Sequence, residues 1–351
     1  MKLDRIKLIT IAAFAATAAA VAAVYFYALI FIPLSGASDI PAAKTVFIPK
    51  GASFRQIANI LVKEGLIKSS KGFDYAASIK GAKKSLQAGE YELSSNMSPY
   101  SILSVMAAGK VKRYAVTIPE GFNMYDVAAA VAKTGLFSAE EFLNKATDKK
   151  FIETFGIDGK AGAGYSLEGY LYPDTYWFTR TMTVEDAIRK MVGRFNEVFD
   201  NDLRRKAKER GYTLKEAVTL ASIIEKETGV VSDMPLISAV FTNRLLKGYR
   251  LESDPTTIYG IKNFNGNLRK KDLQEKTPYN TYSIFGLPAG PIANPGKQAL
   301  IAALEPAKES YLYFVSRNDG THQFSRTLTE HNKAVNTYQK EYFRKKKNSG
   351  Q

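Results

Sequence analysis

The segment Thr213–Gly229, TLKEAVTLASIIEKETG, sets one glutamate, Glu225, within an otherwise apolar helical stripe. Thr213 and Glu216 have the T-x-x-E spacing of a capping box, which predicts a helix that begins at Leu214. On such a helix, an arc roughly 120° wide holds Leu214, Ala217, Val218, Ala221, Ile224 and Glu225. A carboxyl group in that position loses water, and this raises its pKa toward the value that a general acid needs near neutral pH.

The same helix leaves two alternatives to a catalytic Glu225. A buried glutamate paired with an arginine or lysine from elsewhere in the fold would have a purely structural role, because structural ion pairs also perturb pKa values. Glu227 is the substitute candidate, although it lies about 160° away on the helical projection and should point elsewhere. A narrow polar stripe is predicted on another side of the helix, formed by Lys215, Thr219, Ser222 and Lys226.

Composition excludes several other chemistries. The chain has no cysteine and only two histidines, His322 and His331. Disulfides, thiolate metal sites, a cysteine nucleophile and a lipoprotein anchor are therefore excluded, and we expect no metal and no cofactor. The formal net charge of +15 favours a polyanionic partner. Because no basic helix with interleaved aromatic residues is present, we expect no nucleic acid but a cell-wall polymer that carries carboxylates.

The first residues predict a membrane anchor. Leu8–Ile32 carries no charge and would span about 37 Å as a helix, enough for a bilayer core. Lys2, Arg5 and Lys7 precede it, so the positive-inside rule keeps residues 1–7 in the cytoplasm and the rest of the chain outside. A cleaved signal peptide is the alternative, but the apolar run is longer than a signal core, which favours a retained single-pass anchor.

An internal repeat follows the predicted linker at 33–44. Val46–Gly51 (VFIPKG) recurs seventy positions later as Val116–Gly121 (VTIPEG). Each copy predicts a strand, a Pro-Gly turn, an amphipathic helix and a second helix, and Ala88–Leu93 closes the first copy as a strand. This β-α-α-β pattern resembles a LysM module, a small glycan-binding fold, and the alternative is a plain α+β spacer. A helix at Pro99–Ala108 leads into the second copy.

The remaining chain is predicted to be mostly helical with a few short strands, so the fold class is α+β. We expect helices at Val184–Phe199, Leu203–Arg210, Met234–Lys247, Gln298–Ala303 and Thr329–Phe343, strands at Tyr311–Arg317 and Gly320–Phe324, and long ordered loops over Glu252–Gly296. The predicted domains are 1–7 cytoplasmic, 8–32 transmembrane, 33–44 linker, 45–95 LysM-like, 96–158 second repeat, 159–343 catalytic and 344–351 basic tail.

Four further blocks accompany ASIIEKETG (221–229): LEGYLYPDTY (167–176), SDPTTIYG (253–260), YNTYSIFGLPAGPIANPG (279–296) and YLYFVSRNDGTHQFSRTLTEHN (311–332). Together with the anchor and the tandem region, they resemble the endolytic murein transglycosylase family (MltG type, YceG-like). The resemblance implies cleavage of the β-1,4 bond between N-acetylmuramic acid and N-acetylglucosamine inside peptidoglycan strands. The C6 hydroxyl of the muramic acid would attack C1 and leave a 1,6-anhydro end, so one carboxyl group can serve as acid and then base.

The resemblance assigns that acid/base role to Glu225, the residue that the helical pattern also selects. We expect substrate contacts from residues of the other blocks: Glu168, Tyr170, Asp254, Thr256, Asn280, Thr281 and Tyr282. Amide and hydroxyl groups would bond N-acetyl groups, and rings such as those of Tyr170, Tyr172 and Tyr279 would stack on sugars, although aromatic residues equally suit a core. Glu168 could instead hold the geometry of the site, and Asp254 could cap a helix at Thr256–Tyr259.

The family implies an enzyme in the bacterial inner membrane whose catalytic domain faces the periplasm or cell exterior. It would act on nascent glycan strands and terminate their elongation, with penicillin-binding synthases as partners. Two alternatives remain open on the same residues: a hydrolytic muramidase that cuts the same bond, and a wall-binding scaffold without catalysis.

Overall fold

The computed structural model describes residues 2–35, 43–162, 164–341 and 344. It divides into two compact units. The N-terminal unit comprises residues 1–114 and 177–182, and the C-terminal unit comprises residues 115–176 and 183–351. Each unit is described by itself below.

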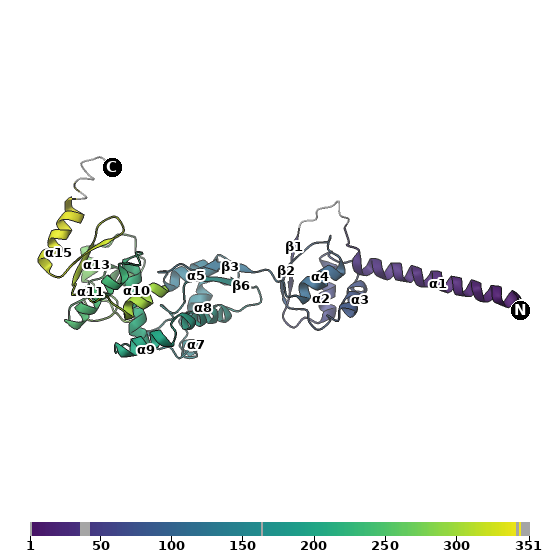
Figure 1. Ribbon diagram of the computed structural model, residues 1–351, viewed down its shortest axis with the longest axis horizontal. Helices are drawn as coiled ribbons and strands as arrows, with labels where there is room; N and C mark the ends of the chain where they lie inside the picture. The colour runs from purple at the N-terminus through teal and green to yellow at the C-terminus, as the bar shows by residue number, and fades with distance from the viewer. Residues whose placement is uncertain (1, 36–42, 163, 342–343, 345–351) are drawn as a thin grey trace. The chain divides into compact units, whose positions relative to one another are not determined.

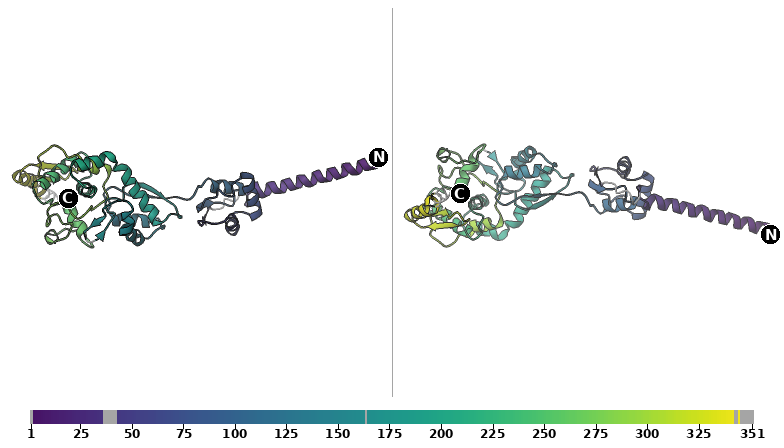
Figure 2. Two further views of the ribbon diagram at one scale, coloured as in Figure 1. Left: turned by 90° about the horizontal axis from the view of Figure 1, so that it is seen from below. Right: turned by 90° about the horizontal axis from the view of Figure 1, so that it is seen from above.

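The N-terminal unit begins with one long apolar helix, α1 (Lys2–Phe31). Its stretch Arg5–Phe31 is long and apolar enough to cross a membrane, and its most apolar window is fully exposed. Figures 1 and 2 show most of α1 running free of other elements of this unit. A soluble helix with such a surface would normally be buried, so the predicted single-pass anchor fits this helix.

The last turns of α1 are part of the core of the N-terminal unit. Ile30 is 3% exposed and belongs to the same buried cluster as Leu61 and Phe73. Gly72 of α3 (Ser70–Lys80) lets the two helices approach closely, because a β-carbon there would lie 2.7 Å from the Leu29 carbonyl oxygen. The anchor is therefore packed into the folded unit and not merely tethered to it.

The rest of the N-terminal unit follows the predicted order of strand, two helices and strand. Strand β1 (Lys44–Ile48) pairs antiparallel with β2 (Gly89–Leu93), and α2 (Phe54–Lys63) and α3 lie between them in sequence. Helix α4 (Pro99–Ala107) follows as predicted. Serines at the N-caps of the three helices accept bonds from free backbone donors, which explains where each helix begins. The likeness to a LysM module stays a prediction.

The second repeat begins the C-terminal part with β3 (Tyr114–Thr117), α5 (Met124–Ala132) and α6 (Ala139–Ala146). The strand that pairs with β3 is β6 (Thr175–Phe178), which lies inside the aromatic block of the sequence. Between α6 and β6 the chain forms three short elements: α7 (Lys149–Glu153), β4 (Lys160–Ala161) and β5 (Gly164–Tyr165). The two copies thus share their opening elements but not their closure.

The C-terminal unit is built around α10 (Leu214–Glu227), which contacts α9, α11, α12 and α14. Its other elements are α8 (Val184–Val198), α9 (Asn201–Glu209), α11 (Met234–Leu246), α12 (Asp254–Gly260), α13 (Lys270–Gln274), α14 (Lys297–Leu304), β7 (Tyr313–Ser316), β8 (His322–Ser325), α15 (Leu328–Val335) and a π-helix η1 (Asn336–Glu341). The predicted helices and the β7–β8 pair are confirmed, while α12 and α13 interrupt the expected loop region. The end of the last predicted helix, 342–343, lies outside the described residues.

The predicted polar stripe of α10 is wrong for two of its members. Thr219 and Ser222 are 1% and 0% exposed, because neighbouring segments cover this side of the helix as well. Ser222 donates to the Thr219 carbonyl oxygen and accepts a bond from the Ile292 amide, so its hydroxyl needs no water. A helix at the centre of a unit can bury small polar residues when the fold supplies partners.

Candidate active site

The start of α10 and its buried arc are as predicted. Thr213 and Glu216 form the reciprocal capping box, with the Glu216 amide 3.2 Å from the Thr213 hydroxyl. The apolar members Ala217, Val218, Ala221 and Ile224 are at most 1% exposed. Glu225 sits in the last turn of this arc and is half-buried.

Glu225 is held by a backbone donor. Its Oε2 accepts a hydrogen bond of 3.0 Å from the Gly296 amide. Burial raises the pKa of Glu225, the Gly296 bond opposes that effect, and the charge of Glu120 raises the pKa further. No lysine or arginine forms an ion pair with Glu225 within the described part of the chain, so the structural ion-pair alternative has no support. A half-buried, unpaired carboxyl group with a raised pKa is suited to give and take a proton.

Glu120 is a site residue that sequence reasoning missed. It is exposed, and its carboxylate lies against Gly296, since a β-carbon on that glycine would be 1.8 Å from Glu120 Oε1. A β-carbon on Gly121 would be 3.6 Å from Glu225 Cγ, so the Pro-Glu-Gly turn lies beside the candidate acid. One signal was available: the first repeat has Lys50 where the second has Glu120, and only the second copy lies at the site.

Asn294 joins this turn to the loop that carries Gly296. Its backbone amide and its side-chain amide both donate to the Phe122 carbonyl oxygen, at 2.8 and 2.9 Å. The Gly121 amide donates to the Asn294 carbonyl oxygen, and Asn294 Oδ1 accepts from the Leu171 amide. Asn294 is fully buried, so these bonds are not exchanged with water. Two loops that flank Glu225 are therefore fixed to each other.

Glu168 supports the site from below. It is 1% exposed and accepts bonds from the Met124 amide, the Tyr259 hydroxyl at 2.9 Å and the Asn294 side-chain amide at 3.2 Å. Burial raises its pKa to about 7 despite these donors. The predicted sugar contact is wrong, because no surface of the side chain is free, and the other predicted role, which is to hold the geometry, fits these bonds.

Four further residues that we expected at the substrate are buried: Tyr170, Thr256, Asn280 and Thr281, none more than 1% exposed. The Thr256 and Thr281 hydroxyls bond each other at 2.8 Å. Asn280 donates to the Glu275 carbonyl oxygen and accepts from Thr257. The Tyr170 ring packs edge-on against Phe195. These groups order the loops of the site, and the prediction that they touch sugar is wrong because their partners are protein groups.

Asp254 and Tyr282 remain accessible. Asp254 is exposed and accepts a bond of 2.7 Å from the Tyr282 hydroxyl. The expected cap role of Asp254 is wrong, since Ser253 occupies the N-cap of α12 and Asp254 is the first helical residue. With Glu227, Glu252 and Arg244, these two residues line a polar cavity of about 300 Å³. Their substrate role stays a prediction.

Glu227 points away from Glu225, as predicted. Its Oε1 accepts a bond of 2.5 Å from the Ser253 hydroxyl, and its carboxyl lines the polar cavity. Burial raises its pKa to about 7, and the charge of Asp254 adds to the rise. Glu227 therefore also has a perturbed pKa, but its partner is a structural serine.

The pKa of Glu227 predicts a pH effect on stability. Between its ordinary pKa of 4.5 and about 7 the folded chain holds a proton that the unfolded chain has lost. The free energy of unfolding should therefore fall as pH rises through this range and level off above it. In Glu227→Gln, which cannot ionise, the fall in Tm from about pH 5 to about pH 8 should be smaller. Thermal melts of Glu140→Gln, an exposed control, should match the unaltered chain, and identical profiles for all three proteins would contradict the prediction.

A larger cavity of about 960 Å³ opens in the C-terminal unit near the Pro-Glu-Gly turn. Tyrosine rings dominate its wall, with the amide of Asn123 and the carboxylate of Asp126 among them: Tyr125, Tyr165, Tyr259 and Tyr279. Tyr259 is the ring that bonds Glu168, and it packs against Tyr279 at 4.8 Å. Flat amphipathic rings mixed with a few polar groups are the lining that a sugar polymer requires.

Fold and site together define a helix-rich α+β protein with a half-buried acid/base candidate and one helix long enough to cross a membrane. The chain belongs to the YceG-like family, whose model matches residues 46–337. The resemblance drawn from the sequence blocks is confirmed.

Named relatives agree with that assignment. An endolytic murein transglycosylase of Bacillus subtilis is 36% identical over 86% of each chain. An endolytic murein transglycosylase of Streptococcus pneumoniae is 30% identical over 83% of this chain, which spans 57% of that protein. A solved structure of a YceG-like protein from Listeria monocytogenes has a TM-score of 0.58 and 33% identity, covering 84% of this chain and 99% of that one.

Proposed function

We propose that the protein is a membrane-anchored lytic transglycosylase that cuts the N-acetylmuramic acid β-1,4-N-acetylglucosamine bond inside nascent peptidoglycan strands. The observation that carries the proposal is Glu225, a half-buried carboxyl group on a central helix, bonded by the Gly296 amide and without a cationic partner among the described residues. The names of the relatives support the same activity.

Glu225 would act twice. Protonated at first, it donates its proton to the glycosidic oxygen as the bond from C1 of the muramic acid to that oxygen breaks. The resulting carboxylate then takes the proton of the C6 hydroxyl while the C6 oxygen bonds to C1. The products are a 1,6-anhydro end and a free hydroxyl on the leaving strand, no water is consumed, and Glu225 is protonated again. The Gly296 amide would steady the carboxylate between the two transfers.

Product analysis tests this reaction. The full chain in detergent should release fragments from purified glycan strands, and mass spectrometry should find anhydro ends on them. Reducing ends with one additional water would instead establish the hydrolytic muramidase alternative. The absence of any fragments would leave the wall-binding scaffold as the remaining alternative.

Glu120 makes the hydrolytic alternative specific, because hydrolases pair two carboxylates at the bond. In Glu120→Gln we expect anhydro products still to form, with a maximal rate within about tenfold of the unaltered enzyme. The charge of Glu120 raises the pKa of Glu225, so its removal should lower that pKa. Activity needs protonated Glu225 and falls as pH rises through its pKa, so the alkaline limb of the pH–rate profile should move to lower pH.

The control for that experiment is Lys50→Gln in the corresponding turn of the first repeat, which should leave the pH–rate profile unchanged. A fall of several hundredfold in Glu120→Gln would show that the reaction needs a second carboxylate and would contradict the single-acid mechanism.

The anchor would place this chemistry at the membrane. Positive residues before α1 favour a cytoplasmic N-terminus and an outward-facing remainder of the chain. Tethering confines the enzyme to strands close to the site of synthesis, which fits a role in terminating elongation beside penicillin-binding synthases. Co-isolation of such a synthase with the full chain from crosslinked membranes is the test of that partnership.

A further inference from the structure

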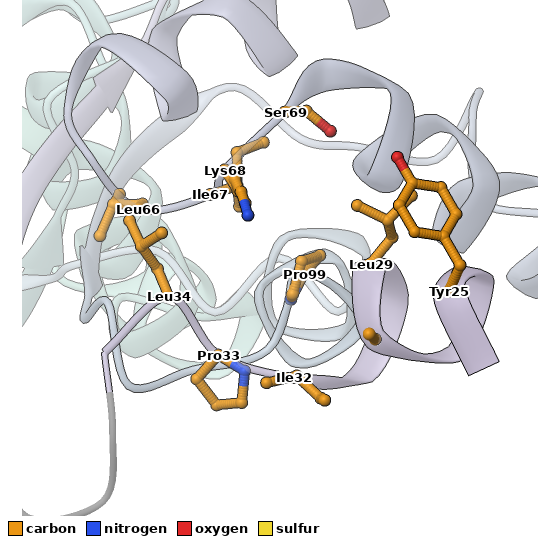
Figure 3. A pocket seen from close by; sticks show the side chains of 11 residues that line it. Tyr25, Leu29, Ile32, Pro33, Leu34, Leu66, Ile67, Lys68, Ser69 and Pro99 are labelled. Carbon is orange, nitrogen blue, oxygen red and sulfur yellow. The ribbon is translucent and has the colours of Figure 1, made fainter.

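A cavity of about 330 Å³ lies where α1 enters the N-terminal unit. One wall is the end of α1 and the segment after it, and the other is formed by residues 66–69 and Pro99 (Figure 3). Most of its lining is apolar, including Leu29, Ile32 and Leu66. The cavity plays no part in the proposed catalytic chemistry, and its place beside the candidate membrane helix calls for an explanation of its own.

The position of the cavity along α1 puts it at the edge of a bilayer. The twenty residues Leu8–Tyr27 rise about 30 Å as a helix, which matches the hydrocarbon core of a typical membrane. Tyr25 and Ala28, which line the cavity, therefore fall at the outer boundary of the core. Tyrosine is enriched at this level because its ring is apolar and its hydroxyl is polar. An opening at this depth faces lipid and not bulk water.

The packing of α1 keeps the cavity formed. Ile30 is buried in the core of the unit, and Gly72 allows α3 to lie directly on the Leu29 carbonyl. The rings of Phe26 and Tyr75 meet edge-on at 4.8 Å between their centroids. Both walls thus belong to one packed body, so a ligand does not have to order them, and a preformed pocket loses less entropy on binding.

The polar groups of the cavity are cationic or neutral. Lys68 extends into the opening, and the Tyr25 hydroxyl and Ser69 lie near its rim (Figure 3). Lys68 is exposed and forms no ion pair with any residue that the structure describes. The segment from Leu66 to Lys84 carries five lysines and a single aspartate, so the surroundings attract anions. Basic residues at a membrane surface are attracted to anionic lipids by about 1 kcal/mol each.

We propose that this cavity binds one anionic phospholipid of the surrounding leaflet. Its phosphate would lie at Lys68 and Ser69, and part of an acyl chain would lie along Leu29, Ile32 and Leu66. An apolar wall that continues from the membrane helix and one unpaired ammonium at the level of the head groups fit this ligand in both chemistry and height. The bound lipid would fix the height of the N-terminal unit at the membrane.

The test uses the full chain in nanodiscs of phosphatidylcholine mixed with phosphatidylglycerol. Native mass spectrometry should find one phosphatidylglycerol retained in preference to phosphatidylcholine after release from the disc. Lys68→Glu should reduce that retention by about tenfold or more. Ala28→Trp, which fills the cavity without a change of charge, should reduce it as well.

Lys71→Glu is the matched control, because Lys71 carries the same charge on the same segment but does not line the cavity. Equal losses in Lys68→Glu and Lys71→Glu would show general surface attraction and overturn the proposal. Retention of phosphatidylcholine as strong as that of phosphatidylglycerol would also overturn it, as would no retained lipid at all. Cleavage of glycan in detergent is measured alongside, so that a failure of lipid binding and a failure of the catalytic proposal are read separately.

Discussion

Glu225→Gln is expected to lower the rate of glycan cleavage by about a thousandfold or more while leaving the fold intact. Glutamine keeps the shape of the side chain and an oxygen to accept the Gly296 amide, but it has no proton to give to the glycosidic oxygen. General acid–base catalysis contributes about 10²- to 10⁴-fold, and here one group serves both steps. The measurement is the initial rate of fragment release by the full chain, together with a thermal melt.

Glu216→Gln is the matched control for this experiment. It removes a carboxylate from the same helix but keeps the capping box, because glutamine also suits the third helical position. Its rate should equal that of the unaltered enzyme. If Glu225→Gln cleaves at the full rate while Glu227→Gln does not, the acid is Glu227 and the assignment made here is wrong. Binding of glycan strands should persist in Glu225→Gln.

The position of Glu225 could be predicted because its information is local. A capping box fixes where α10 begins, and the helical repeat then determines which residues share a face with Leu214. Neither inference depends on the rest of the chain. The repeated strand, turn and helix could be predicted for the same reason, because both copies carry their own start and stop signals.

The partners of the polar residues could not be predicted, because they come from distant parts of the chain. Thr281 bonds Thr256, and Asn294 bonds Phe122 across 172 positions. A sequence shows that such residues are polar, but it does not show whether protein groups already satisfy them. Thr256, Asn280 and Thr281 were therefore assigned to substrate when they order loops. Glu120 was overlooked because its turn reaches the site only through the fold.

Asn294→Leu is expected to destabilise the C-terminal unit by about 3 to 5 kcal/mol. Leucine has a similar size but loses the side-chain bonds to Phe122, Leu171 and Glu168. The Leu171 amide would then be buried without an acceptor, and each such buried group costs about 1 to 3 kcal/mol. Tm should fall by about 10 °C, read from the melt of the full chain.

Asn144→Leu, a change of the same chemistry at an exposed site on α6, should leave Tm nearly unchanged. Activity provides the second measurement for Asn294→Leu. Gly296 follows Asn294 by two residues and donates to Glu225, so a loosened loop should lower the maximal rate even at temperatures where the variant remains folded. A folded variant with an unchanged rate would show that the Gly296 bond does not depend on Asn294. The site would then owe its geometry to α10 alone, and the network around Glu168 would serve stability only.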